Sequence, residues 1–109
     1  MRLTTTMRWL GTALALLAGA AQADALVEAG RDKARACAVC HGQAGVAVAP
    51  ETPHLAGQPP GYLAAQLKAY RSGARKHEVM AVMARPLSDD DIAALAAWFS
   101  SIRVEATPP

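Results

Sequence analysis

The sequence predicts an all-α domain with three main helices and two long loops. Three stretches place apolar residues at the three- and four-residue steps of a helix. No stretch of any length alternates apolar and polar residues as a half-buried strand does. The segments between the three stretches are rich in glycine and proline, as loops are.

The first 23 residues have the pattern of a secretory signal peptide. A positive start, an uncharged apolar run and a small-x-small cleavage pattern follow one another: Arg2 and Arg8, residues 9–20, and Ala21-Gln22-Ala23. The apolar run is short for a bilayer span, which needs roughly 20 residues, so an uncleaved membrane anchor is the weaker alternative. We expect residues 1–23 to be removed and residues 24–109 to form one small domain.

The predicted mature chain is balanced in charge and poor in aromatic residues. Two of the eleven lysines and arginines lie in the signal peptide, which leaves nine basic against nine acidic residues. This balance gives no reason to expect binding to nucleic acid or to an anionic membrane surface. A domain of this size has a thin core, so a cofactor would supply apolar surface that the few aromatic side chains lack.

Residues Ala25 to Ala36 are predicted to form the first helix of the domain. Asp24 can cap its start, and its apolar residues fall on one side. Gly30 lies in the middle of this helix, where glycine costs about 1 kcal/mol relative to alanine. We interpret this glycine as a point where another helix crosses close to the backbone.

The next residues read Cys-x-x-Cys-His, with Cys37, Cys40 and His41, which is the attachment pattern of a c-type haem. Two such thiols can form thioether bonds at one porphyrin edge, and the histidine can then bind the iron. The alternatives are a disulfide, a thioredoxin-like redox pair, or a zinc site completed by His54 and His77. The adjacent histidine and the absence of a βαβ pattern disfavour the thiol proteins, and the histidine spacing is unlike that of zinc fingers. Export favours haem, because c-type haem is attached outside the bacterial inner membrane.

Residues 42–57 have no periodicity and are predicted to form the first long loop, which needs something such as a haem to pack against. Pro53 lacks an N–H, so its segment offers a carbonyl oxygen without a competing donor. A ligating histidine usually donates its other ring N–H to such an acceptor. Pro53 is therefore a candidate contact for the haem ligand.

The second and third helices have clear start and stop residues. Pro59-Pro60 opens the second helix and Gly73 ends it. Ser88 caps the third helix, and three acidic residues fill its first turn, where the helix dipole favours them. The apolar stripes of the two helices are Leu63, Leu67 and Tyr70, then Ile92, Leu95, Ala96, Phe99 and Ile102. Residues 104–109 are predicted to be a short tail.

A second irregular stretch, Ala74 to Leu87, carries candidates for the sixth iron ligand. Met80 and Met83 lie about forty residues after the Cys-x-x-Cys-His motif, far enough to reach the other face of a haem. A thioether raises the reduction potential, whereas a second histidine lowers it. His77, His54 and water are the other candidates. The residues favour a methionine but do not distinguish Met80 from Met83.

Taken together, the motifs resemble the class I c-type cytochromes, and more closely the halves of cytochrome c4 and the single-haem c553 type. The resemblance covers nearly all of residues 24–109. Its motifs are Cys37-Ala-Val-Cys40-His41-Gly42, Pro53-His-Leu-Ala-Gly-Gln58, Tyr62-Leu-x-x-Gln-Leu67, Tyr70-Arg-x-Gly-x-Arg75, Met80-x-x-Met83 and Leu87-Ser-Asp-x-Asp-Ile92-x-x-Leu-Ala-x-Trp98-Phe99.

This resemblance implies a small cytochrome c fold wrapped around one covalently attached haem. It implies that the first and last helices cross near Gly30 and Trp98. It also implies that the Pro53 carbonyl accepts the Nδ1–H of His41.

The resemblance also implies a choice between the two methionines. In this family the ligating methionine lies eight residues before the serine of the Leu-Ser-Asp stretch. Counting back from Ser88 gives Met80, so Met83 becomes a packing residue.

We therefore expect a periplasmic electron carrier rather than an enzyme. One haem c, held by Cys37 and Cys40 with His41 and Met80 on the iron, would shuttle single electrons. Its transient redox partners would be an oxidase, a reductase or a dehydrogenase. The alternative is an open-site haem enzyme or a gas-binding haem protein without a methionine ligand, in which His77 is the one candidate distal residue.

Overall fold

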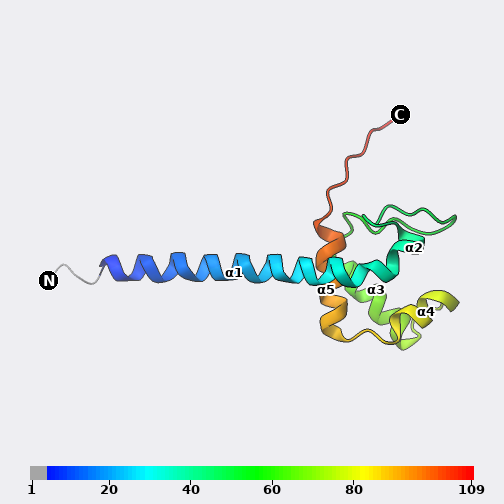
Figure 1. Cartoon of the computed structure of the whole chain (residues 1–109), viewed down its shortest axis with the longest axis horizontal. Coiled ribbons are helices and arrows are strands. Elements are labelled where there is room, and N and C mark those ends of the chain that lie inside the picture. Colours follow the sequence, from blue (N-terminus) through cyan, green and yellow to red (C-terminus); the bar gives the residue numbers. More distant parts are fainter. Residues whose placement is uncertain (1–4) are drawn as a thin grey trace.

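The computed structural model describes residues 5–109, with side chains from residue 15 onward, and this part of the chain is helical without a strand. Its elements are α1 (Thr5–Lys33), the 3₁₀ turn η1 (Ala34–Cys37), α2 (Ala38–His41), α3 (Pro60–Ser72), α4 (Glu78–Ala84) and α5 (Asp89–Ser101). The predicted all-α fold class is confirmed, with α1, α3 and α5 as the main helices (Figure 1).

The first helix differs from the prediction at both of its ends. It runs without a break from Thr5 to Lys33, so Asp24 lies inside the helix and does not cap it. The alanine-rich sequence around the predicted cleavage site explains this continuity, because alanine is the strongest helix former. At its other end, residues predicted to be α-helical form the tighter 3₁₀ turn of η1. Arg2 of the predicted signal peptide lies outside the described residues, as does the side chain of Arg8.

The N-terminal part of α1 projects away from the other helices, which pack around its C-terminal end (Figure 1). Every residue from 15 to 26 is exposed, and the first buried residue of α1 is Gly30. Within residues 5–109, no helix combines the length and the apolar character that a membrane span requires.

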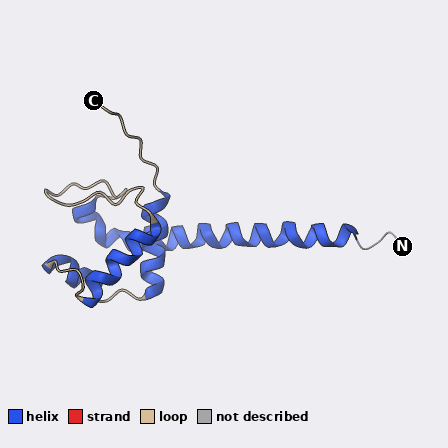
Figure 2. Ribbon diagram, turned by 180° about the vertical axis from the view of Figure 1, so that it is seen from behind, coloured by secondary structure: helices blue, strands red, loops and turns tan. Residues whose placement is uncertain are grey.

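Helix α1 crosses α5 at Gly30, as predicted (Figure 2). A Cβ atom added at Gly30 would lie 2.6 Å from the carbonyl carbon of Ala94 and 2.8 Å from Cβ of Trp98. Beside the crossing, Lys33 Nζ lies 2.8 Å from Asp91 Oδ1 and joins the two helices. Only glycine permits this close approach, so packing offsets the lower helix propensity at this position.

The hydrophobic core lies between α5, η1 and α3. Its buried members are Ala34, Leu63, Leu95, Ala96 and Phe99. Leu95 is fully buried in this core, and Ile92, one turn earlier on α5, is fully buried as well. The predicted stripe of α5 therefore supplies most of the residues of this core.

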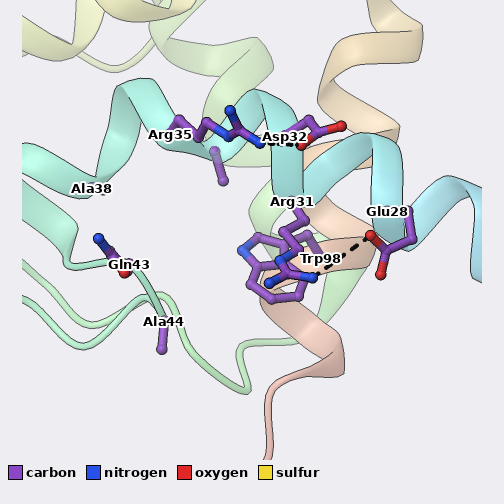
Figure 3. A pocket seen from close by; sticks show the side chains of 9 residues that line it. Glu28, Arg31, Asp32, Arg35, Ala38, Gln43, Ala44 and Trp98 are labelled. Carbon is purple, nitrogen blue, oxygen red and sulfur yellow. Dashed lines mark hydrogen bonds and ion pairs between the residues drawn. The ribbon is translucent and has the colours of Figure 1, made fainter.

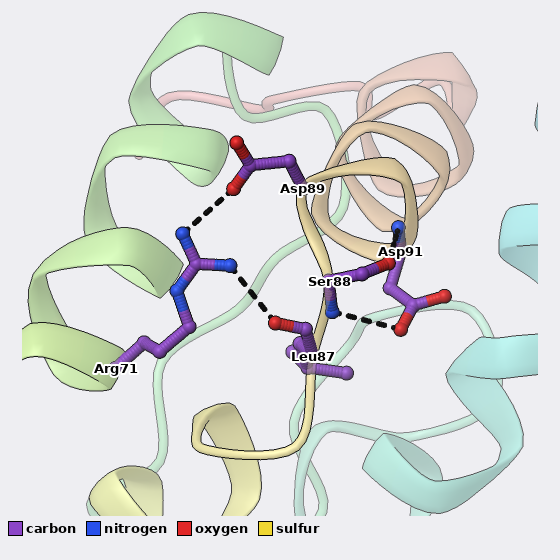
Figure 4. Close-up of polar contacts among 5 residues, drawn as sticks. All are labelled: Arg71, Leu87, Ser88, Asp89 and Asp91. Carbon is purple, nitrogen blue, oxygen red and sulfur yellow. Dashed lines mark hydrogen bonds and ion pairs between the residues drawn. The ribbon is translucent and has the colours of Figure 1, made fainter.

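The helix boundaries that depend on local capping agree with the sequence. Gly73 ends α3 in the left-handed conformation at φ 83°, which costs glycine little. Ser88 caps α5: its Oγ accepts the N–H of Asp91 at 3.1 Å, and the Asp91 carboxylate accepts the N–H of Ser88 at 2.9 Å (Figure 4). This reciprocal pair is a capping box.

The prediction that residues 74–87 are irregular throughout is wrong. They contain α4, a helix of seven residues from Glu78 to Ala84. Its sequence holds glutamate, methionine and alanine, which favour helix. It is too short for a clear apolar period, so periodicity alone could not reveal it.

Candidate functional site

The Cys-x-x-Cys-His residues form two consecutive helical turns, η1 and α2. Positions three apart lie on the same side of a helical turn, so the spacing places Cys37 and Cys40 on one side. Both are free, partly buried thiols. Gly42 then ends α2 at φ 77°, and its N–H donates to the carbonyl of Ala38 at 2.9 Å.

Burial raises the pKa of the Cys37 thiol, so this group stays protonated at neutral pH. A thioredoxin-like pair works in the opposite way, because its attacking cysteine has a lowered pKa. The surroundings of Cys37 therefore do not fit a reactive dithiol.

The imidazole of His41 is buried, with 8% of the residue exposed, and its orientation is fixed. Its Nδ1 lies 2.9 Å from the carbonyl oxygen of Pro53. A carbonyl oxygen can only accept, so Nδ1 carries the proton and donates it. The lone pair of Nε2 is then available for a metal. This is the contact that the family resemblance implies.

The first long loop folds back on itself to bring Pro53 to His41. The carbonyl of Gly45 accepts the N–H groups of Leu55 and Ala56 at 2.7 and 3.1 Å. Gly45 has φ 72°, and a Cβ there would lie 2.8 Å from the ring of Phe99. A side chain at this position would push the loop away from α5 and so away from His41.

The two candidate methionines both lie on α4. Met80 is partly buried, whereas Met83 is exposed at 37%. The backbone N–H of Met80 donates to His77 Nδ1 at 3.2 Å. In both overall views, α2 with its loop and α4 lie on the side of the domain away from the N-terminus, one above the other (Figures 1 and 2).

The segments around the motif and on α4 expose several large apolar side chains. They are Val39, Val46, Val48, Val79, Val82 and Met83, with Val39 exposed at 81%. Burying such side chains would contribute roughly 1.5–3 kcal/mol each. An apolar cofactor held by the Cys37, Cys40 and His41 donor set would cover surface of this kind. The residues therefore fit a haem both in donor chemistry and in apolar character.

The histidines of the zinc alternative are used elsewhere. Nδ1 of His54 accepts the N–H of Ala47 at 2.8 Å, and Nδ1 of His77 accepts the N–H of Met80. Across the described residues, no cluster of three or more His, Cys, Asp or Glu side chains could hold a metal ion. The structure thus gives the zinc interpretation no support.

A separate groove lies between α1, α2 and α5 and contains none of the predicted ligand atoms (Figure 3). It has a volume of about 750 Å³, and its charged residues pair along α1 and into η1: Arg31 with Glu28 at 3.8 Å and Arg35 with Asp32 at 2.8 Å. The Arg31 guanidinium lies 5.9 Å from the ring centre of Trp98, whose Nε1–H is buried without a partner in the described structure. No sequence pattern pointed to this groove.

The sequence reasoning also missed two contacts that hold α4 and its flanking residues. One is the hydrogen bond from Met80 to His77, and the other joins Arg71 to Leu87 and Asp89. The first is a local N-cap contact between positions three apart. The second joins residues 16 and 18 positions apart, which no local spacing rule identifies. The one available signal was a histidine immediately before a short run of helix formers.

The helical fold and the Cys-x-x-Cys-His site define a c-type cytochrome, and the chain belongs to the cytochrome c family, whose sequence profile matches residues 20–103. It is 49% identical over 76 residues to cytochrome c-554(548) of Halomonas halodenitrificans, covering 67% of this chain and 92% of that protein. It is 40% identical over 94 residues to cytochrome c4 of Stutzerimonas stutzeri, covering 78% of this chain and 45% of that one.

Two further comparisons agree on family and fold. A protein of Stutzerimonas stutzeri named thiosulfate dehydrogenase electron acceptor is 43% identical over 74 residues, covering 65% of this chain and 34% of that one. The crystal structure of reduced cytochrome c4 from Pseudomonas stutzeri superposes with a TM-score of 0.67 at 41% identity, covering 71% of this chain and 45% of that one. The chain thus spans nearly all of one relative and less than half of the others.

Membership of this family establishes the coarse function. The protein carries covalently bound haem c, and Cys37 and Cys40 are the two cysteines of the sequence. It is a haem c electron-transfer protein.

Proposed function

We propose that this protein is a periplasmic single-haem electron carrier in which His41 and Met80 are the axial ligands of the iron. The observation that carries the proposal is the hydrogen bond from His41 Nδ1 to the Pro53 carbonyl, which leaves the lone pair of Nε2 free to bind a metal. The bound haem c supplies an iron centre that gains and loses one electron.

The residues of the chain hold this centre in a fixed environment. Cys37 and Cys40 tether the group, and the Pro53 carbonyl fixes the tautomer and the direction of His41. Met80 offers a soft thioether, which stabilises the reduced iron and raises the potential. It is partly buried, and α4 lies on the same side of the domain as α2.

With His41 and Met80 both bound to the iron, the haem would carry electrons and would leave no iron position for a substrate. The open-site alternative needs a free distal group, and His77 was its candidate. In the structure His77 Nδ1 accepts the N–H of Met80, which supports a role in holding α4 rather than in proton transfer.

The proposed compartment rests on the predicted signal peptide, and the proposed partners rest on the relatives. Leu16 and Leu17 on the projecting part of α1 are exposed and contact no core, as suits a signal peptide that is removed on export. One relative is named as the electron acceptor of thiosulfate dehydrogenase. We propose a dehydrogenase as the electron donor and a reductase or an oxidase as the acceptor. Contacts of this kind are small and transient.

The ligand assignment is tested by the absorption spectrum of the oxidised haem-loaded protein. We expect a methionine-to-iron charge-transfer band that is lost in Met80→Ala and retained in Met83→Ala. Met83 is the matched control, because it lies on the same face of α4 one turn further along. High-spin iron in the wild type, or loss of the band in Met83→Ala alone, would contradict the proposal.

A further inference from the structure

We propose that His77 is a positioning residue for the sixth ligand: its imidazole fixes the first turn of α4 and so holds Met80 toward the iron. This inference rests on the proposed ligation by His41 and Met80. It concerns how the chain keeps the iron–sulfur bond closed against competing ligands.

The geometry at the start of α4 joins the two residues directly. His77 is the N-cap, with an extended backbone at φ −160° and ψ 126°, and its side chain accepts the N–H of Met80 at 3.2 Å. The acceptor is Nδ1, so the ring proton is on Nε2. A side chain that accepts the N–H of the third helical residue is the usual N-cap contact. Here that third residue is the proposed ligand.

The shortness of α4 makes this cap important. Nucleating a helical turn is unfavourable, and helices much shorter than about 12 residues are marginal on their own. The seven residues of α4 end directly in a turn, and its first N–H groups depend on the cap. Without His77 the first turn of α4 loses the contact that fixes the backbone of Met80.

The imidazole is itself held against α3. Its ring meets the ring of Tyr70 edge-on, with centroids 6.4 Å apart and an interplanar angle of 75°. Arg75 covers Tyr70, with its guanidinium carbon 4.7 Å from the ring centre, and donates to Gln66 Oε1 at 2.8 Å. His77 therefore transmits the position of α3, a core helix, to the backbone of Met80.

A second contact holds the far end of the same segment. Arg71 of α3 donates to the carbonyl of Leu87 at 2.9 Å and to Asp89 Oδ1 at 2.7 Å (Figure 4). This clamp fixes the residues that follow α4 and precede α5. Of these two contacts, only the one from His77 ends on Met80.

The test is displacement of the methionine by added imidazole in the oxidised haem-loaded protein. The displacement is monitored as the loss of the charge-transfer band. An N-cap replaced by alanine weakens a helix start enough to change an opening equilibrium by about five-fold. We expect His77→Ala to raise the apparent affinity for imidazole by about this factor. His77→Asn should restore the wild-type value, because asparagine is a good N-cap.

Ser88→Ala is the matched control. It removes the cap of α5, which does not contact Met80 in the described structure, and so lowers stability without acting on the ligand. We expect it to leave imidazole binding unchanged. If His77→Ala matches the wild type, if His77→Asn fails to restore it, or if Ser88→Ala has the same effect, the positioning role is wrong.

Failure of the ligand assignment itself has a different outcome. In that case the wild type shows no methionine band, and Met80→Ala binds imidazole no more tightly than the wild type. With the band present and His77→Ala unchanged, Met80 remains the ligand and only the role of His77 is overturned.

Discussion

The side chain of Asp91 shows how much a single residue can connect in a domain this small. It receives the N–H of Ser88 and pairs with Lys33 of α1 at 2.8 Å, so it both caps α5 and links the crossing helices. The hydrogen bond from Lys33 and the N–H of Ser88 hold the pKa of Asp91 below its usual range. The hydrogen bond from Arg71, with the charge of Lys68, does the same for the pKa of Asp89.

These lowered pKa values predict a loss of stability in acid. A carboxylate whose folded-state pKa is depressed contributes stability above its unfolded value, about 3.9, and loses it as the pH falls through the folded value. We expect the urea concentration at the unfolding midpoint of the haem-loaded protein to decrease when the pH is lowered below about 4. The dependence should be shallower in Asp91→Asn, which keeps a cap acceptor but loses the charge.

Asp90→Asn is the control for this effect. Asp90 lies on the same turn and makes no ion pair in the described structure, so its replacement should leave the acid dependence as in the wild type. An equal change in both variants would show that the general charge of this turn, and not the contact with Lys33, determines the effect.

At the scale of elements, the crossing of α1 and α5 fixes where the Cys-x-x-Cys-His turn begins. Gly30 lies seven residues before Cys37 and touches the α5 backbone at Ala94. The motif follows from the end of α1 through η1 without a flexible link. The position of the haem tether therefore depends on this helix contact.

Gly30→Ala is expected to destabilise the protein despite the better helix propensity of alanine. The added Cβ would overlap the carbonyl of Ala94, and overpacking of this kind costs about 1–3 kcal/mol. Gly61→Ala on α3 is the matched control: its Cβ meets nothing within 4 Å, so stability should rise by up to about 1 kcal/mol. The free energy of unfolding in urea, followed by helical circular dichroism, measures both. A stabilised Gly30→Ala would refute the close crossing.

At the scale of the whole molecule, the described part of the predicted signal peptide stands apart from the domain. Residues 15–26 are all exposed, and partly buried side chains begin at Val27. Removing residues 1–23 would take away no packing among the described side chains. The remaining part of α1 would still reach from the predicted cleavage site to the crossing with α5.

We expect the exported protein to begin at Asp24, as measured by its intact mass. Ala23→Phe should block cleavage, because signal peptidase requires a small residue at this position. Gln22→Leu changes the variable middle residue of the small-x-small pattern, so this variant should still be cleaved. The mature form should have the same urea midpoint as the uncleaved Ala23→Phe form. Recovery of wild-type protein with its first 23 residues intact would favour the membrane-anchor alternative.

Much of the fold and the site was predictable, because the signals for them are local. The apolar stripe of α5, the Gly73 and Ser88 caps and the spacing of the Cys-x-x-Cys-His motif each depend on residues within a few positions of one another. The crossing at Gly30 was predictable as well, because glycine lowers the stability of a helix interior unless a close contact requires it. Pro53 could be nominated from its missing N–H, and the structure shows its carbonyl at His41.

Tertiary structure decided what depends on residues far apart in the chain. The sequence could not reveal α4, since seven residues show no reliable period. It could not show that His77 rests on Tyr70, or that Arg71 reaches Leu87 and Asp89. The amino-acid sequence by itself determined the haem attachment chemistry, because that chemistry lies in five consecutive residues. Only the folded chain determines how the segment bearing Met80 is held, because that depends on packing against α3.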